Sequence, residues 1–288
     1  MPRGPVTTRH GSRLEFTCPL DFEQILWPLL SGVKGAVTPT GAGADKTWAF
    51  LPSTSTPPAL DYYTIEYVER SPDDNAEMEF GYAWVSELEI TATSDGLAEM
   101  RVVAMGRASA DSTMTGALAV PVLNYAANLR WAGYIDPAWA SLGSTQISAQ
   151  LYGFRWTYRN NVHPGFYLDN RSSLDFTQPE FARPEVEIEM DIVHDPDSAA
   201  FVQTEEALKI ANTARFIQFK LTGATLGAGT YSLILNTSAY HAEDSLTDRG
   251  GDREGNLSAR AHFLSAYDVT SGNQMGVTVV NALTAFPA

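Results

Sequence analysis

The chain has 288 residues, 44% of them hydrophobic, which is enough for one large domain or two modest domains with a core. Only 18% of the residues are charged, and the 22 glycines and 16 prolines favour many short strands with frequent turns over a helical protein. The net charge of −15 argues against a protein that binds nucleic acid through phosphate contacts, but it is compatible with a wall past which DNA slides.

The first 20 residues are expected to form an N-terminal arm. Residues 1–13 are basic and have no periodicity or apolar centre, so they do not resemble a signal peptide; they are expected either to stay disordered or to order on assembly. No run approaches the ~18 apolar residues of a transmembrane helix, so no membrane partner is expected. The single cysteine, Cys18, excludes an intramolecular disulfide and fits a reducing cytoplasm.

A short helix is expected at residues 21–31. Its apolar stripe at helical spacing consists of Phe22, Ile25, Leu26, Leu29 and Leu30. Asp21 and Gln24 are placed as a capping pair at its start. Pro28 removes a hydrogen bond inside a helix, at a cost of about 3 kcal/mol or more, so the helix is expected to be short or kinked.

A β-hairpin is expected at residues 77–107, after short strands at 47–51 and 62–69. On its first strand, Phe80, Tyr82, Trp84, Leu88 and Ile90 alternate with Glu87, Glu89, Thr91 and Thr93. Alternate residues of a strand point to opposite faces, so this pattern predicts one apolar and one acidic face. Asp95-Gly96 supplies the tight turn, and the return strand places Glu99 and Arg101 on the polar face.

The second half of the chain repeats this combination of strands. Residues 108–125 have no clean period and are expected to connect a first domain at 21–125 to a second domain at 126–288. Residues 151–159 predict an aromatic strand, and residues 185–193 (EVEIEMDIV) predict a strand with one apolar face. The opposite face of that strand carries Glu185, Glu187, Glu189 and Asp191. One aromatic and one apolar/acidic strand in each half suggest an internal duplication.

The remaining elements are a helix at 198–211, strands at 214–221, 230–240, 256–268 and 275–283, and a long polar loop at 241–255. A loop of that length is usually functional or mobile. Two weaker chemical patterns are present in the sequence. The histidines His194 (beside Asp195) and His241 (near Glu243 and Asp244) could each form half of a metal site, and Asp248, Asp252, Glu254 and Asn256 faintly resemble a calcium loop. Solvated loop residues are the expected state in both cases.

Two stretches carry a resemblance to a known family. ELEITATSDG at 87–96 lies within a hairpin that resembles the central hairpin of tailed-bacteriophage tail tube (major tail) proteins. YIDPAWASLGST at 134–145, followed by an aromatic strand and NNVHP at 160–164, is similar to the second half of the same family. The order and spacing of these stretches extend the resemblance over residues 22–283.

The resemblance implies a mainly β fold of two tandem tail-tube-like β-sandwich or half-barrel domains, each with a short helix. It implies a non-enzymatic virion protein of a long-tailed siphovirus, without a cofactor, assembled in the host cytoplasm. Its rings would stack into a tube, bind tape-measure and tail terminator proteins, and conduct DNA without binding it specifically. Since this family builds six-fold rings from single units, a duplicated chain predicts a trimeric, pseudo-hexameric ring.

Two sets of residues are assigned roles on this basis. The acidic side chains expected to face the lumen are Glu87, Glu89, Glu99, Glu185, Glu187, Glu189 and Asp191. The residues expected to make contacts between rings are Asp244, Asp248, Arg249, Asp252 and Arg253. Alternatively, or in addition, Arg101, Arg155 and Arg159 pair with these acids across strands in exposed ion pairs worth about 0.2–1 kcal/mol each.

A different class of function is a two-domain β-sandwich that binds carbohydrate or a host receptor through exposed aromatic side chains. An enzyme is the third choice, because no GxSxG or Walker A motif is present.

Overall fold

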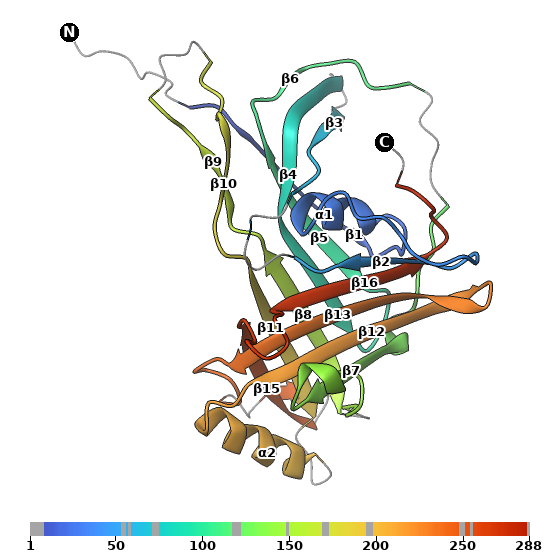
Figure 1. Ribbon diagram of the computed structural model, residues 1–288, viewed down its shortest axis with the longest axis vertical. Coiled ribbons are helices and arrows are strands. Elements are labelled where there is room, and N and C mark those ends of the chain that lie inside the picture. Colours follow the sequence, from blue (N-terminus) through green and yellow to red (C-terminus); the bar gives the residue numbers. More distant parts are fainter. Residues whose placement is uncertain are drawn as a thin grey trace.

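The structure is a computed structural model, and it describes residues 9–52, 56, 59–70, 75–116, 122–147, 150–168, 173–193, 198–247, 251–253 and 256–286. The protein is mainly β, as the sequence predicts (Figure 1). The described strands form one large antiparallel sheet that folds over on itself, together with a separate two-stranded ribbon.

The sheet has two layers. The first layer has the strand order β1-β5-β4-β8-β11-β15, formed by Ser12–Pro19, Glu99–Gly106, Asn75–Thr93, Leu151–Arg159, Glu185–Val193 and Asn256–Ser265. The second layer contains β2, β16, β13, β12 and β7, formed by Lys46–Phe50, Met275–Asn281, Gly229–His241, Arg215–Leu226 and Trp131–Asp136. The layers are joined where Tyr240 and its two neighbours on β13 pair with β15. Figure 1 shows the second layer crossing the first at a steep angle.

The main core lies between the two layers. Phe154 on β8 stacks on Phe219 on β12, with ring centroids 3.8 Å apart and planes 5° from parallel. Trp156 is fully buried, and its Nε1 donates to Thr237 Oγ1 across the layers at 3.1 Å. Because one face of the first layer packs into this core, polar side chains lie on its other face.

The helix expected at 21–31 begins later, since α1 spans Leu26–Gly32 and packs on β4. Asp21 caps a preceding turn, where its Oδ1 accepts from the Glu23 and Gln24 amides at 2.9 and 2.8 Å. Pro28 therefore lies in the first turn, where an amide has no partner within the helix, and it costs no hydrogen bond. The helix expected at 198–211 is confirmed, with α2 at Ala199–Ile210.

The prediction that residues 1–20 form an N-terminal arm is wrong for residues 12–19, which form strand β1. Strand β1 pairs with β5 along its whole length, while residues 1–8 lie outside the described residues. The sequence of β1 alternates: Phe16 and Cys18 pack against the core, and Arg13 and Glu15 point outward. This period of two is the strand signal that the arm prediction overlooked.

The sheet is continuous across residue 125, where the sequence suggested a domain boundary. Strand β4 pairs with β8, and β2 pairs with β16 near the C-terminal end of the chain. A single main core contains residues from both halves. The predicted hairpin and the two predicted strands of the second half are thus neighbours in one layer, and no break in the described strands marks two separate units.

A projection extends from the body beyond the first layer. It contains β3 (Tyr63–Arg70), the N-terminal part of β4 and β6 (Ala110–Asp111), while the ribbon of β9 (Val162–Gly165) and β10 (Gln178–Phe181) stands beside it (Figure 1). A smaller core of Leu60, Trp84, Val162 and Phe176 lies at the base of these two extensions. The described chain also contains short 3₁₀ turns at Asn128–Arg130 and Trp139–Ser141 and a short strand, β14, at Gly251–Arg253.

The single apolar face predicted for residues 80–90 is wrong at its centre. Tyr82 has φ of +56°, and the pairing of β4 with β5 shifts register between Val85 and Glu87. Trp84 consequently packs in the smaller core, while Val85 and Leu88 pack in the main core. A bulge inserts one residue and so exchanges the faces of a strand, which alternation alone does not reveal.

Candidate functional site

The outer face of the first layer is covered by charged side chains. All seven acids predicted for a lumen lie on this face, at alternate positions of β4, β5 and β11. The charged face is defined here by two sets of described side chains. Its acids are Glu15, Glu87, Glu89, Glu99, Glu185, Glu187, Glu189 and Asp191, and its arginines are Arg13, Arg101, Arg155, Arg159 and Arg260.

A continuous series of ion pairs, extended by two contacts of His262 with carboxylates, crosses the charged face from one edge of the layer to the other. We call it the charge ladder, and its members in order are Arg13, Glu15, Arg101, Glu87, Arg159, Glu187, His262 and Asp244. The N–O distances are 2.6 Å for Arg13–Glu15, 2.7 Å for Arg101–Glu15 and 3.0 Å for Arg159–Glu87. The later steps are 2.9 Å for Arg159–Glu187, 3.0 Å for His262–Glu187 and 2.7 Å for His262–Asp244.

The predicted pairing of arginines with acids across strands is confirmed. Arg101 bonds Glu15 and Glu87 on its two neighbouring strands, and Arg159 likewise bonds Glu87 and Glu187. Arg155 adds a separate pair with Glu189 at 2.6 Å. Each of these arginines bonds carboxylates, so its charge is largely neutralised within the charged face.

Acid still exceeds base on this face, with eight carboxylates against five guanidinium groups among the described side chains. Hydrogen bonds from Arg101 and Arg13 lower the pKa of Glu15. Burial opposes ionisation of Glu187, but the hydrogen bond and charge of Arg159, together with His262, outweigh it and lower the pKa of Glu187. These carboxylates therefore stay ionised at neutral pH, and the face is acidic.

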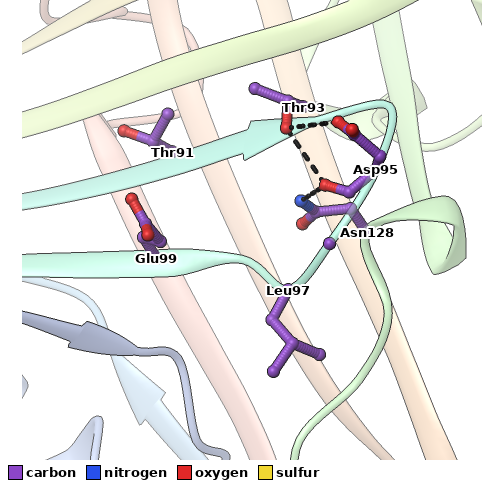
Figure 2. Close-up of a pocket in the computed structure, with 7 residues that line it drawn as sticks. Thr91, Thr93, Asp95, Leu97, Glu99 and Asn128 are labelled. Carbon is purple, nitrogen blue, oxygen red and sulfur yellow. Dashed lines mark hydrogen bonds between the residues drawn. The ribbon is translucent and has the colours of Figure 1, made fainter.

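The β4–β5 turn closes one end of the charged face. Figure 2 shows Asp95 braced from two sides: Thr93 Oγ1 donates to the Asp95 carbonyl at 3.1 Å, and Asn128 Nδ2 donates to the same oxygen at 2.9 Å. The shallow hollow at this turn is lined by Thr91, Thr93, Asp95, Gly96, Leu97, Glu99 and Asn128. Leu97 points away from the polar group and is 42% exposed, which leaves an apolar rim at this end.

A buried ionic cluster lies under α2, and the sequence patterns did not reveal it. Glu205 is 2% exposed and accepts from Arg215 Nε at 3.0 Å and Nη2 at 2.8 Å. His241 Nε2 lies 3.2 Å from Glu205 Oε2, and His241 Nδ1 lies 2.9 Å from Ser245 Oγ. The expected solvated state of His241 is therefore wrong, because its side chain is 1% exposed and contacts Glu205 and Ser245.

The order Ser245, His241, Glu205 has the hydrogen-bond sequence of a nucleophilic triad. Ser245 is completely buried, however, and its Oγ accepts the His262 amide at 2.9 Å, so a substrate carbonyl has no approach. Arg215 also occupies the Glu205 carboxylate on two atoms. This arrangement ties α2 to the sheet. Among the described residues, no group of three or more His, Cys, Asp or Glu side chains could hold a metal ion.

The predicted inter-ring loop is only partly described. Its first part, residues 242–247, lies against β15, with the Ala242 amide donating to His262 O at 2.9 Å and the Leu246 amide to Arg260 O at 2.7 Å. Asp244 is exposed there and ends the charge ladder. Asp248 and Arg249 lie outside the described residues, and so do the side chains of Asp252 and Arg253. His194 and the calcium-like positions 248 and 254 also fall outside them.

No protein-family model matches the chain, and no curated protein matches it either. None of the described helices has the length and apolar character needed to cross a bilayer.

Proposed function

We propose that this chain is a structural, non-enzymatic subunit of the tail tube of a long-tailed bacteriophage. Copies assemble side by side into rings, the rings stack into a tube of the virion tail, and DNA passes through the lumen. The resemblance of residues 79–107 and 128–170 to tail tube proteins supports this proposal. The observation that carries it is the charged face, a broad polar surface backed along its whole width by a packed core.

The chemistry of the charged face suits a conduit for DNA. Duplex DNA carries one negative charge per about 1.7 Å, so an acidic wall repels it and a basic wall retains it. Arg101 and Arg159 each bond carboxylates on both sides, which leaves them little capacity to bind phosphate. The seven predicted acids would line the lumen, and passage would need no specific contact or cofactor.

The edges of the first layer support lateral assembly. Among the described strands, β1 pairs with β5 alone and leaves its other edge open. An open edge of eight residues is a template for unwanted pairing unless another chain covers it. Side-by-side packing of copies around a closed ring covers every such edge.

The two ends of the first layer support stacking of rings. Because β8 runs antiparallel to β4, the β9–β10 ribbon lies at the opposite end from the β4–β5 turn. Both ends expose large apolar side chains: Leu97, Leu123 and Leu129 near the turn, and Tyr167, Leu168 and Phe181 near the ribbon. Contacts of one end with the other end of the next copy build an open filament.

The number of chains in the ring depends on the predicted duplication. A trimeric, pseudo-hexameric ring requires two equivalent units in each chain, whereas the described strands of both halves share one sheet and one main core. Six chains per ring would follow if the chain is a single unit. Tape-measure and tail terminator proteins remain the proposed partners, and the inter-ring role of residues 241–255 remains part of the proposal.

Electron microscopy of the purified protein tests the proposal. Rings or tubes are expected, and the rotational symmetry of a reconstruction gives the number of chains. The reconstruction also shows which side of the wall the charged face occupies. A monodisperse monomer at high concentration, or a tube with these seven acids on its outer surface, would contradict the proposal. Fully buried aromatics such as Trp48, Trp84 and Trp156 do not favour the alternative of a carbohydrate-binding platform.

A further inference from the structure

We propose that the side-to-side contact between copies joins the β1 edge of one chain to residues 242–247 of the next, with Arg13 against Asp244. The partner is thus a second copy of this chain in the same orientation. This inference rests on the proposed function, because it assigns the surfaces through which a ring closes.

The charge ladder has opposite charges at its two ends. Each interior member has a ladder partner on both sides, whereas Arg13 and Asp244 each have one ladder neighbour among the described residues. Their side chains are also the most exposed members of the ladder, at 56% for Arg13 and 72% for Asp244. A cation therefore ends the ladder at β1, and an anion ends it beside β15.

The β1 edge can receive a neighbour through its backbone as well. The Leu20 amide donates to Ala98 O at 2.8 Å, so even-numbered residues of β1 face β5 in the antiparallel ladder. The amides and carbonyls of Arg13, Glu15 and Thr17 therefore point to the open edge. Their side chains lie on the charged face and are exposed, so a second copy reaches both sets of groups together.

The opposite edge of the layer is closed to strand pairing. The amides of Ala242 and Leu246 already bond the carbonyls of β15, and Ser245 Oγ accepts the His262 amide. Residues 242–247 and β14 thus cover this edge, and Lys209 of α2 donates to the carbonyls of Glu243 and Ser245. The side chains of Glu243 and Asp244 remain exposed there. The contact with β1 would be made by this segment and its acids, and not by continuing the ladder of β15.

Charge complementarity selects the orientation of the second copy. Two copies in the same orientation place Arg13 against Asp244 and continue the alternation of charge from one chain into the next. A two-fold pairing of β1 edges would instead bring two copies of the same edge together and leave Asp244 without the opposite charge of Arg13. The same-sense contact is heterologous, and such a contact closes into a ring by rotation.

Charge reversal tests the contact. Arg13→Glu alone or Asp244→Lys alone is expected to lower the assembled fraction at least tenfold in sedimentation and electron microscopy. The two substitutions in one chain recreate an opposite-charge pair and are expected to restore assembly to within twofold of the original protein. Lys220→Glu is the matched control, because Lys220 lies on the outer side of the second layer; it changes the charge equally and is expected to assemble normally.

Circular dichroism and urea unfolding confirm that each variant folds. Normal assembly of Arg13→Glu, or a folded double variant that does not assemble while Lys220→Glu does, would overturn the assigned contact and leave the tube function standing. Absence of rings from the unmodified protein would overturn both proposals. These outcomes keep the failure of the contact distinguishable from the failure of the function.

Discussion

Replacing Glu205 by Gln is expected to destabilise the fold more than any single change on the charged face. The substitution keeps the size of the side chain but removes the negative charge that faces Arg215 on two atoms, at 3.0 and 2.8 Å. Arg215 is 8% exposed and would be left as a buried charge without a counter-ion. Breaking a buried pair in this way costs about 3–5 kcal/mol in the free energy of unfolding.

The magnitude depends on the unpaired charge, and a double variant separates that effect from lost packing. Glu205→Met with Arg215→Met removes both charges and leaves only His241 Nε2 without its partner. Its free energy of unfolding is expected to lie within about 2 kcal/mol of the original protein. Glu189→Gln is the matched control, since its pair with Arg155 is half-exposed and worth about 1 kcal/mol or less.

Urea titration followed by far-UV circular dichroism measures all three variants, and equal slopes permit direct comparison of midpoints. The reasoning is refuted if Glu205→Gln destabilises no more than Glu189→Gln. It is also refuted if the double variant is less stable than Glu205→Gln alone.

Three further predictions concern the charged face and the core. Arg159→Met removes the guanidinium between Glu87 and Glu187, which then keep only their contacts with Arg101 and His262 among the described residues. The substitution should cost about 1–2 kcal/mol at low salt and less than half of that at 1 M salt, measured by urea titration in both buffers. The pKa of Glu187 is lowered in the folded state, so its contribution to stability is complete above its ordinary pKa of 4.5 and is lost as pH falls through the lower folded pKa. Because Arg159 helps to lower this pKa, urea midpoints between pH 6 and 3 should fall less steeply for Arg159→Met than for the original protein. Equal slopes would contradict this. Asn281→Ala removes the acceptor of Trp48 Nε1 and the donor to Phe22 O, both of which are buried. The substitution should therefore cost about 2–4 kcal/mol in the free energy of unfolding and alter tryptophan fluorescence. A cost below 1 kcal/mol would contradict a structural role for these two hydrogen bonds.

Much of the charged face could be predicted from the sequence, because a strand with one buried face shows it directly as alternation. The acids of residues 185–193 are all on one face, as their spacing indicates. The same rule failed at residues 80–90, since the positive φ of Tyr82 and the register shift before Glu87 are set by packing against two different cores. The mainly β class and the second helix followed from composition and period alone.

Contacts between distant segments could not be predicted in this way. Glu205 and Arg215 are ten residues apart, and His241 follows 26 residues after Arg215, so no motif spacing joins them. The strand β1 was missed because basic residues and proline near the N-terminus outweighed a short alternating pattern. The shared sheet of the two halves depends on strand order, which a repeated pattern of strands does not specify.

The 19 residues of β4 run from the projection into the body as one continuous strand. Its C-terminal part pairs with β5 and β8, and its N-terminal part pairs with β3 and β6 (Figure 1). A force that pulls on the projection along β4 loads many of the hydrogen bonds between β4 and its neighbours in shear at the same time, so these bonds do not open one after another. Tension at the tip is therefore transmitted into the β-layer of the body, and the projection behaves mechanically as a continuation of that layer.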